Sequence, residues 1–281
     1  MNKTLHGKVA IVTGSGGKNG MGRAIANRLA KDGAKIVVTD LVESPYKDKN
    51  WNGLSSVVEE INLGGGESIK ILADVTNSES IDNVIKKTIK TFGRIDILVN
   101  NAGSAAGSDR VPITELLEKD WDRVMNINLK GVFLFCKAVS KYLIHQCNEG
   151  RIINISSIAG KKASETFGAY STSKAGLIRL TETLALELAK YKITANSICP
   201  SWVQTERLDN FSSIDNKYTS FKSNLSEHQK RQLTVQGIES SIPLGRLASV
   251  DDIAGAASYL SSEEASFITG VSLNVSGGII A

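Results

Sequence analysis

Short apolar runs rich in β-branched residues alternate along the chain with longer stretches whose apolar residues recur every three or four positions. Several short runs are apolar throughout, as in strands buried on both faces, and the longer stretches have helical spacing. This alternation predicts an α/β protein with a mostly parallel sheet and helices on both faces. The expected strands are 9–13, 35–39, 68–73, 95–100, 151–156, 193–198 and 271–275. The expected helices are 22–31, 81–92, 121–146, 170–190 and 250–261.

Two segments interrupt the alternation. Residues 41–53 contain Pro45, Tyr46 and Trp51 among polar neighbours and are expected to form an extended surface loop. Residues 206–241 form a longer polar stretch, and a structureless loop of that length is uncommon unless it is a lid or a binding loop. We expect short helices there, in a substrate-binding lid. Because no linker or repeat divides the sequence, residues 1–281 are predicted to form one domain.

The composition narrows the functional classes. Apolar residues make up 41% of the 281 positions, which is enough for one large core. The 33 Lys and Arg nearly balance the 29 Asp and Glu, without a basic stripe, so no nucleic-acid partner is expected. The three cysteines and three histidines lack metal-ligand or disulfide spacing, so we expect no metal and a cytoplasmic protein with reduced thiols. A strand predicted from residue 9 leaves no room for a signal peptide, and no apolar stretch is long enough to span a membrane.

A glycine-rich turn joins the first predicted strand to the first predicted helix. In such a turn, backbone N–H groups can approach a diphosphate at the helix N-terminus. A glycine cluster alone is a common turn, but its position between strand and helix favours the dinucleotide interpretation. The expected cofactor contacts in this turn are Gly14, Ser15, Asn19, Gly20, Met21 and Gly22.

The second predicted strand leads into Asp40, followed by Leu41 as a further expected contact. An acid at this place suits the ribose hydroxyls of NAD and repels the 2′-phosphate of NADP. The alternative is an ordinary turn residue at a strand end. Lys18 and Arg23 count against NAD, because either side chain could in principle reach a 2′-phosphate. NAD is therefore the expected cofactor, with NADP as the less favoured alternative.

Small and polar residues also follow the third and fourth predicted strands. Asp74 and Val75 stand where the adenine edge would lie, and Asn100, Ala102 and Gly103 where the chain would pass close to a ribose. Each pair or triplet alone could be an ordinary turn. Their places at successive carboxyl ends of strands fit ligand binding by an open α/β sheet.

A Tyr-x-x-x-Lys step begins the predicted helix 170–190. Lys174 comes one helical turn after Tyr170, so the two side chains share a face, and a nearby ammonium favours the phenolate form of a tyrosine. Ser157, thirteen residues before Tyr170, could hold a substrate oxygen. This arrangement suits proton transfer in a carbonyl/alcohol pair. A second copy, Tyr218 and Lys222, lies in a polar stretch and is interpreted as a coincidence.

Together these motifs resemble the short-chain dehydrogenase/reductase family, from about Gly7 to Gly278. The resemblance implies a single-domain, doubly wound Rossmann-like fold with seven parallel strands, usually assembled as a homotetramer or a dimer. It also implies roles for specific residues. The implied catalytic residues are Asn128, Ser157, Tyr170 and Lys174, of which Tyr170 and Lys174 also contact the cofactor, and the implied nicotinamide contacts are Pro200, Val203 and Thr205.

The sequence departs from the family pattern at three places. Five residues separate Gly14 from Gly20 where the family usually has three, so the turn must bulge by two residues. Ser201 replaces a glycine, and Ser276 replaces an aspartate. None of these changes removes an expected catalytic group.

The resemblance implies an oxidoreductase that transfers a hydride between NAD and a secondary alcohol or ketone. Sugars, polyols, cyclic alcohols and hydroxy acids all remain open as the small-molecule substrate. One alternative is an NADPH-dependent 3-oxoacyl-[acyl-carrier-protein] reductase, against which Asp40 counts. Another is a non-catalytic dinucleotide-binding sensor or scaffold, against which the complete set of expected catalytic residues counts.

Overall fold

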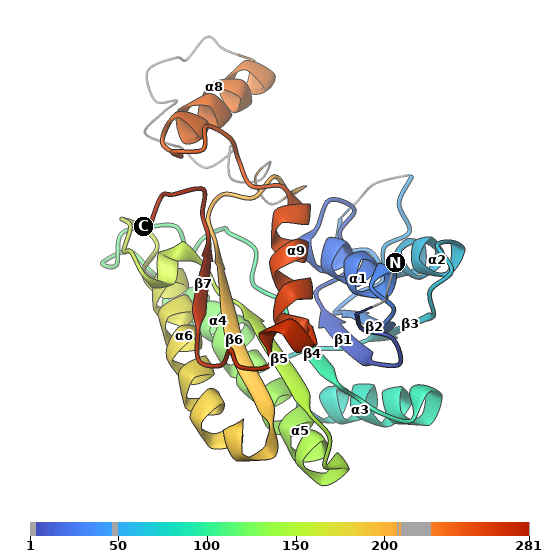
Figure 1. Cartoon of the computed structure of the whole chain (residues 1–281). Helices are drawn as coiled ribbons and strands as arrows, with labels where there is room; N and C mark the ends of the chain where they lie inside the picture. The colour runs from blue at the N-terminus through green and yellow to red at the C-terminus, as the bar shows by residue number, and fades with distance from the viewer. Residues whose placement is uncertain (1–3, 47–49, 207, 209–225, 281) are drawn as a thin grey trace.

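Seven parallel strands form one sheet in the computed structural model, in the order β3-β2-β1-β4-β5-β6-β7 (Figure 1). The structure describes residues 4–46, 50–206, 208 and 226–280. The predicted α/β class and the predicted parallel sheet are confirmed. The strands are β1 (Val9–Thr13), β2 (Lys35–Asp40), β3 (Ser68–Leu72), β4 (Ile97–Asn100), β5 (Gly150–Ile155), β6 (Ile193–Pro200) and β7 (Ser272–Val275).

Helices cover both faces of the sheet because neighbouring residues of a strand point to opposite sides. Val12 of β1 packs in a core with α1 (Met21–Lys31), α2 (Leu54–Leu63) and α9 (Val250–Ser261). Ile11, its neighbour, packs in a second core with α3 (Ser78–Phe92), α5 (Gly131–Gln146) and α6 (Gly168–Leu188). Both side chains are fully buried, which explains why the strand sequence is apolar from Val9 to Val12.

The strand order reverses between β1 and β4, which lie side by side with Val12 opposite Val99. The chain leaves β1 toward β2 on one side, and β4 leads toward β5 on the other. At such a reversal the connections after the two strands diverge and leave a crevice at their carboxyl ends, which is the usual ligand site of an open α/β sheet. The glycine-rich turn after β1 and the residues after β4 therefore meet at this point.

Two helical features differ from the sequence expectation. The expected helix 121–146 is divided into α4 (Glu118–Met125), a π-helical turn (Asn126–Lys130) and α5. Helix α2 was not predicted, although Leu54, Val57 and Ile61 have helical spacing and are buried.

The described part of the expected lid includes helix α8 (Glu227–Ser240), which Figure 1 shows beyond the carboxyl edge of the sheet. Ser226 begins it with a capping box that includes Gln229. Ile238 of this helix and Ile242 after it pack with Leu208 and Leu247. The second Tyr-x-x-x-Lys copy lies outside the described residues. None of the described helices is long and apolar enough to cross a membrane.

Candidate active site

Tyr170 and Lys174 lie one turn apart at the beginning of α6, as the spacing predicted. The Lys174 side chain is buried, and its Nζ donates to the Ile155 carbonyl at the end of β5 (2.8 Å). This Nζ lies 5.8 Å from the centroid of the Tyr170 ring. The end of β5 therefore fixes the ammonium beside a half-buried phenol.

The two serines after β5 have different partners. Ser156 Oγ donates to the Lys174 carbonyl (2.9 Å) and so ties the strand end to α6. Ser157 Oγ accepts from the Ala159 N–H (3.1 Å) and begins a short 3₁₀ turn, Ile158–Gly160. Gly160 lets this turn pack on α6, because a Cβ there would lie 2.7 Å from the Lys174 carbonyl carbon.

Asn128 is fully buried in the π-helical turn between α4 and α5. Its Oδ1 accepts from the Ser104 N–H (2.7 Å), and its Nδ2 donates to Ser173 Oγ (3.1 Å). Ser173 Oγ in turn donates to the Tyr170 carbonyl (2.7 Å). The π turn, a feature often found at functional sites, thus places Asn128 between the segment after β4 and the helix of Tyr170.

The glycine-rich turn packs closely on the segment after β4. Gly14 has a φ of 68°, and a Cβ there would lie 2.7 Å from the Ala102 Cα. A Cβ on Gly22 would lie 2.3 Å from the Gly14 carbonyl oxygen. Asn101 Nδ2 donates to the same oxygen (2.8 Å). Only glycine fits at these two places, and the helix N-terminus is thereby held close to the sheet edge.

Asp40 holds the bulged part of this turn from the end of β2. Its Oδ2 accepts from the Gly16 N–H (2.9 Å), and its Oδ1 accepts from the Leu41 N–H (2.8 Å). The indole of Trp51 donates to the Gly16 carbonyl (2.7 Å) and is buried. The expectation of an extended surface loop at 41–53 was therefore wrong for Trp51, because its indole packs against the two-residue bulge.

Arg23 is engaged within the protein. Its Nε and Nη2 donate to the two carboxylate oxygens of Glu60 (2.8 and 2.7 Å), and its guanidinium lies 5.0 Å from the Trp51 ring centroid. Partial burial of Glu60 opposes ionisation, but hydrogen bonds from Arg23 and Asn27 hold the pKa of Glu60 below its usual value. This bidentate pair fixes the arginine on α2.

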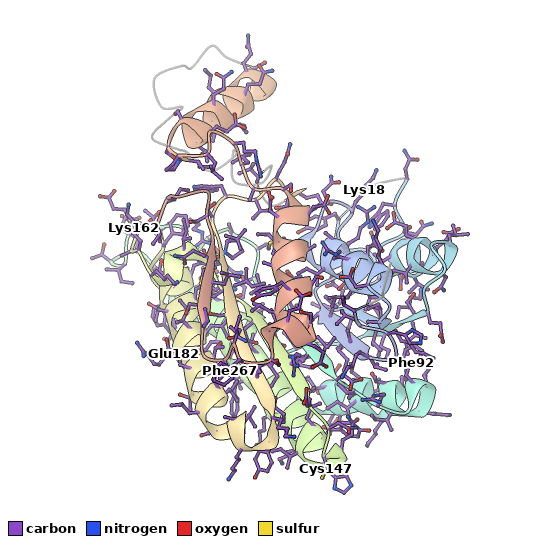
Figure 2. The ribbon with its side chains drawn as sticks, in the orientation of Figure 1. Lys18, Phe92, Cys147, Lys162, Glu182 and Phe267 are labelled. Atoms are coloured by element: carbon purple, nitrogen blue, oxygen red, sulfur yellow. The ribbon has the colours of Figure 1, made fainter. Side chains whose placement is uncertain are left out.

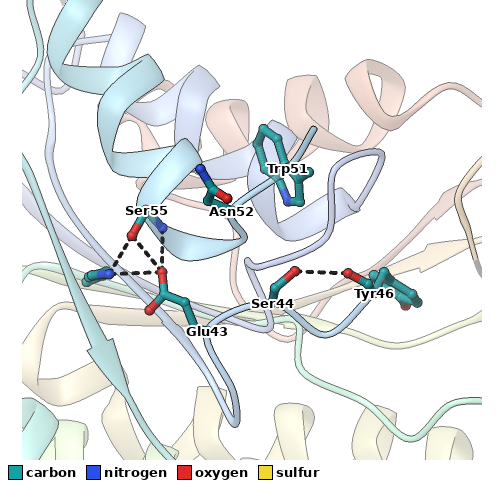
Figure 3. Close-up of a pocket in the computed structure, with 7 residues that line it drawn as sticks. Glu43, Ser44, Tyr46, Trp51, Asn52 and Ser55 are labelled. Atoms are coloured by element: carbon teal, nitrogen blue, oxygen red, sulfur yellow. Dashed lines mark hydrogen bonds and ion pairs between the residues drawn. The ribbon is translucent and has the colours of Figure 1, made fainter. Parts of the chain in front are cut away.

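A hollow of about 460 Å³ adjoins Trp51 on the segment that follows β2 (Figure 3). Glu43 accepts there from the Ser55 N–H (2.8 Å) and pairs with Lys70 (2.9 Å). None of the predicted site residues lines it. The lining residues are Glu43, Ser44, Tyr46, Trp51, Asn52, Ser55 and Lys70.

The residues expected to follow β3 and β4 meet in one place. Val75, Asn100 and Ala102 line a narrow crevice together with Thr13 and Ile127. The Asn100 side chain is directed into the protein, where its Nδ2 donates to Asn154 Oδ1 (2.8 Å). Asp74 caps its own turn by accepting from the Thr76 N–H (2.8 Å), so its carboxylate has a structural partner as well.

The residues after β6 form a tight connection. Val203 bridges to Ala248, and the Gln204 N–H donates to the Ala248 carbonyl (2.9 Å). Thr205 follows directly, and its carbonyl accepts from the Leu208 N–H (3.0 Å). Cys199, just before Pro200, is buried, and burial raises the pKa of its thiol, as in a packing residue.

Two residues near the expected site were missed by the sequence analysis. Glu206 accepts a hydrogen bond from the Asn19 N–H of the glycine-rich turn, which lies 187 residues earlier in the chain. Arg110 lies with its guanidinium carbon 4.4 Å from the Tyr170 ring centroid. Neither belongs to a motif, and no local spacing could have indicated these contacts. The described residues contain no group of three or more His, Cys, Asp or Glu that could hold a metal ion.

Comparison with known proteins shows similarity over almost the whole chain. Residues 14–280 match the family profile described as enoyl-(acyl carrier protein) reductase. A 3-oxoacyl-[acyl-carrier-protein] reductase of Synechocystis is 38% identical over 277 residues, covering 98% of each chain. Glucose 1-dehydrogenase 2 of Bacillus subtilis is 36% identical, covering 99% of this chain and 97% of its own. The solved structure of an NAD⁺-bound xylitol dehydrogenase superposes with a TM-score of 0.85 at 33% identity, covering 98% of this chain and 99% of its own.

Proposed function

Because the chain belongs to the short-chain dehydrogenase/reductase family, we propose that it transfers a hydride between NAD and the CH–OH/C=O group of a secondary alcohol or ketone. The observation that carries the proposal is the grouping of Tyr170, Lys174 and Asn128 around the ends of β4 and β5. Ser157 begins the turn that packs on the same helix. A non-catalytic sensor or scaffold would not require Tyr170, Lys174 and Asn128 to lie together.

The residues divide the proton chemistry among them. In oxidation the Tyr170 phenolate accepts the hydroxyl proton of the substrate, and in reduction the phenol returns it. Lys174 places a positive charge beside the phenol, and Ser157 donates a hydrogen bond to the substrate oxygen. Asn128 holds the segment after β4 against α6. Bound NAD would supply the hydride acceptor, and Lys174 and Tyr170 would hold its nicotinamide end.

The site favours NAD over NADP through two side chains. Asp40 places a carboxylate at the end of β2, where a ribose 2′-phosphate would meet like charge. Arg23 is the obvious cation to offset it, but Glu60 and Trp51 occupy its guanidinium. We propose that the turn from Gly14 to Gly22, with Asn19 and Met21, holds the diphosphate, and that Leu41, Asp74 and Val75 surround the adenosine.

A second candidate function rests on the Synechocystis relative, whose name is 3-oxoacyl-[acyl-carrier-protein] reductase. An NADPH-linked reductase of this kind would have to bind the 2′-phosphate of NADPH despite the negative charge of Asp40. The relatives' names cover a sugar, a polyol and an acyl chain. The substrate panel should therefore include all three classes, together with cyclic alcohols and hydroxy acids.

The decisive experiment compares the wild-type protein with Tyr170→Phe. Formation of reduced nicotinamide is followed with NAD and with NADP across the panel. We expect NAD-linked turnover that falls by a factor of roughly 10² or more in the variant, because the proton acceptor is lost. NAD affinity, measured by calorimetry, should stay nearly unchanged. Unchanged turnover in Tyr170→Phe would refute the proposed mechanism.

We propose a homotetramer in the cytoplasm, with a dimer as the alternative. Several large apolar side chains far apart in the sequence are exposed, among them Phe267 (102%), Leu186 (83%) and Phe133 (43%). Figure 2 shows Phe267 beside the lower end of β7. Burial of such side chains between copies would stabilise an oligomer. The three cysteines are free thiols, as in a reducing compartment. Light scattering after size-exclusion chromatography measures the assembly.

A further inference from the structure

A buried arginine lies against the ring of the proposed proton carrier. Arg110 belongs to the segment between β4 and α4, and its side chain is only 6% exposed. Its guanidinium carbon lies 4.4 Å from the Tyr170 ring centroid and 4.2 Å from that of Phe167. The two rings meet edge to face at 6.1 Å. A cation on an aromatic face interacts more strongly when the cation is desolvated, and the Arg110 side chain is nearly buried.

The guanidinium is fixed by a buried carboxylate. Asp109 Oδ2 pairs with Arg110 Nη1 (3.2 Å), and the Asp109 side chain is 1% exposed. Asp109 Oδ1 also accepts from Arg123 Nη2 (3.0 Å) and from the Gly107 N–H (3.1 Å). Asp109 is therefore held by two arginines and a backbone amide, and Arg110 has a defined position relative to the ring.

The same segment also reaches the proposed catalytic asparagine. Arg123 donates to Ser104 Oγ, and the Ser104 N–H donates to Asn128 Oδ1 (2.7 Å). Hydrogen bonds and ion pairs thus run from Asn128 through Ser104, Arg123 and Asp109 to Arg110. The segment after β4 contacts both Asn128 and Tyr170, although the two residues lie on different helical elements.

We propose that Arg110 is a positioning residue for Tyr170, which holds the ring in place and favours the phenolate form needed in oxidation. The inference rests on the proposed role of Tyr170. Among the described residues, Arg110 from the segment after β4 and Lys174 from α6 (5.8 Å) lie over the ring, and Asp109 pairs with Arg110. A cation on the ring face stabilises a phenolate more than a neutral phenol, because the phenolate carries a full negative charge.

The competing explanation is that Arg110 only fills the space between two rings. A neutral side chain of similar length would then serve equally well. We therefore compare Arg110→Met, which removes the charge but keeps an unbranched stem, with Arg110→Lys, which keeps the charge without the planar guanidinium. Arg179→Met is the matched control, because Arg179 lies on the same helix as Tyr170 with a side chain that is 81% exposed.

The first measurement is the pH profile of kcat for alcohol oxidation. In Arg110→Met we expect the half-maximal rate to move upward by about one pH unit. KM for NAD should change less than about twofold, because the other contacts of Arg110 described above, Phe167 and Asp109, are not among the proposed cofactor residues. Arg110→Lys should lie between wild type and Arg110→Met, and Arg179→Met should match wild type. Superimposed profiles for wild type and Arg110→Met, or equal shifts for the Lys and Met variants, would overturn the proposal.

The second measurement does not depend on turnover. Phenolate absorbance is titrated against pH in the whole protein with and without Tyr170→Phe, and the difference between the two curves isolates Tyr170. The same two titrations are made in the Arg110→Met background. We expect the Tyr170 phenolate to form at higher pH without the arginine, and coincident curves would contradict this. If Tyr170→Phe keeps its activity, the proposed function fails while this titration still tests Arg110. Should Arg110→Met fail to fold, Arg110→Gln, which keeps a donor for Asp109, takes its place with the same expected shift.

Discussion

The substitution Asp40→Asn tests both proposed roles of the acid at the end of β2, as a holder of the bulged turn and as an acid that disfavours NADP. In the wild-type protein each carboxylate oxygen accepts one backbone N–H, from Gly16 at 2.9 Å and from Leu41 at 2.8 Å. Asparagine has one carbonyl oxygen, so it can keep only one of these bonds, and its amide would face the other N–H. The substitution therefore removes the negative charge and also weakens the hold on the bulged turn.

The expected magnitudes follow from this geometry. A hydrogen bond to a charged group contributes about 1.5–3 kcal/mol, and solvent screening at this half-exposed site reduces the loss to about 1–2 kcal/mol. Two like charges about 6 Å apart repel by roughly 3 kcal/mol at an effective dielectric constant of about 20. Salt screening would reduce this repulsion by about half, to about 1.4 kcal/mol, which corresponds to a tenfold change in relative affinity. The NADP-to-NAD ratio of kcat/KM should therefore rise about tenfold.

The assay measures kcat/KM with each cofactor and the free energy of unfolding in urea. Glu43→Gln is the matched control, because it neutralises a nearby acid that bonds to Ser55 and Lys70 instead of the turn. We expect the control to leave the cofactor ratio unchanged. If Asp40→Asn lowers stability but not NAD preference, Asp40 is only a turn residue and the cofactor reasoning is wrong.

Two further predictions concern stability. Gly22→Ala should lower the free energy of unfolding by about 1–3 kcal/mol and weaken NAD binding, because its Cβ would lie 2.3 Å from the Gly14 carbonyl oxygen. Gly255→Ala is the control, because its Cβ would have a neighbour only at 3.8 Å, and it should leave the free energy of unfolding in urea unchanged or raise it. An equal loss of stability in the two alanine variants would contradict the steric argument. The hydrogen bond from Arg246 lowers the pKa of Asp252 from 3.8 to about 2, so this pair stabilises the fold above pH 3.8 and loses its effect as the pH falls toward 2. As the pH falls over that range, the difference in the free energy of unfolding between wild type and Arg246→Met should decrease. A difference that is independent of pH would contradict the stabilising effect of the pair.

The strands were predictable because their burial leaves a local signature. Residues 9–12 and 36–38 are apolar throughout, and the structure shows β1 and β2 at the predicted places, with β2 one residue longer. The helix of Tyr170 and Lys174 was also predictable, because its apolar residues recur at helical spacing. Within such a helix, the four-residue step places the side chains of Tyr170 and Lys174 on one face. Helix α2 was missed because its ten residues follow an irregular loop, and the π turn at Asn128 leaves no mark in the apolar pattern.

Local patterns in the sequence were enough to predict the fold class and the glycine-rich turn, because apolar periodicity and a glycine cluster are features of neighbouring residues. The catalytic residues expected from the Tyr-x-x-x-Lys step and the family resemblance stay predictions. Which charged side chains meet became clear from the tertiary structure. Arg23 pairs with Glu60, 37 residues away in the sequence. Arg110, in the segment between β4 and α4, contacts the ring of Tyr170 on α6. Side chains so distant in sequence are brought together by the packing of the helices on the sheet, and no local periodicity records that packing.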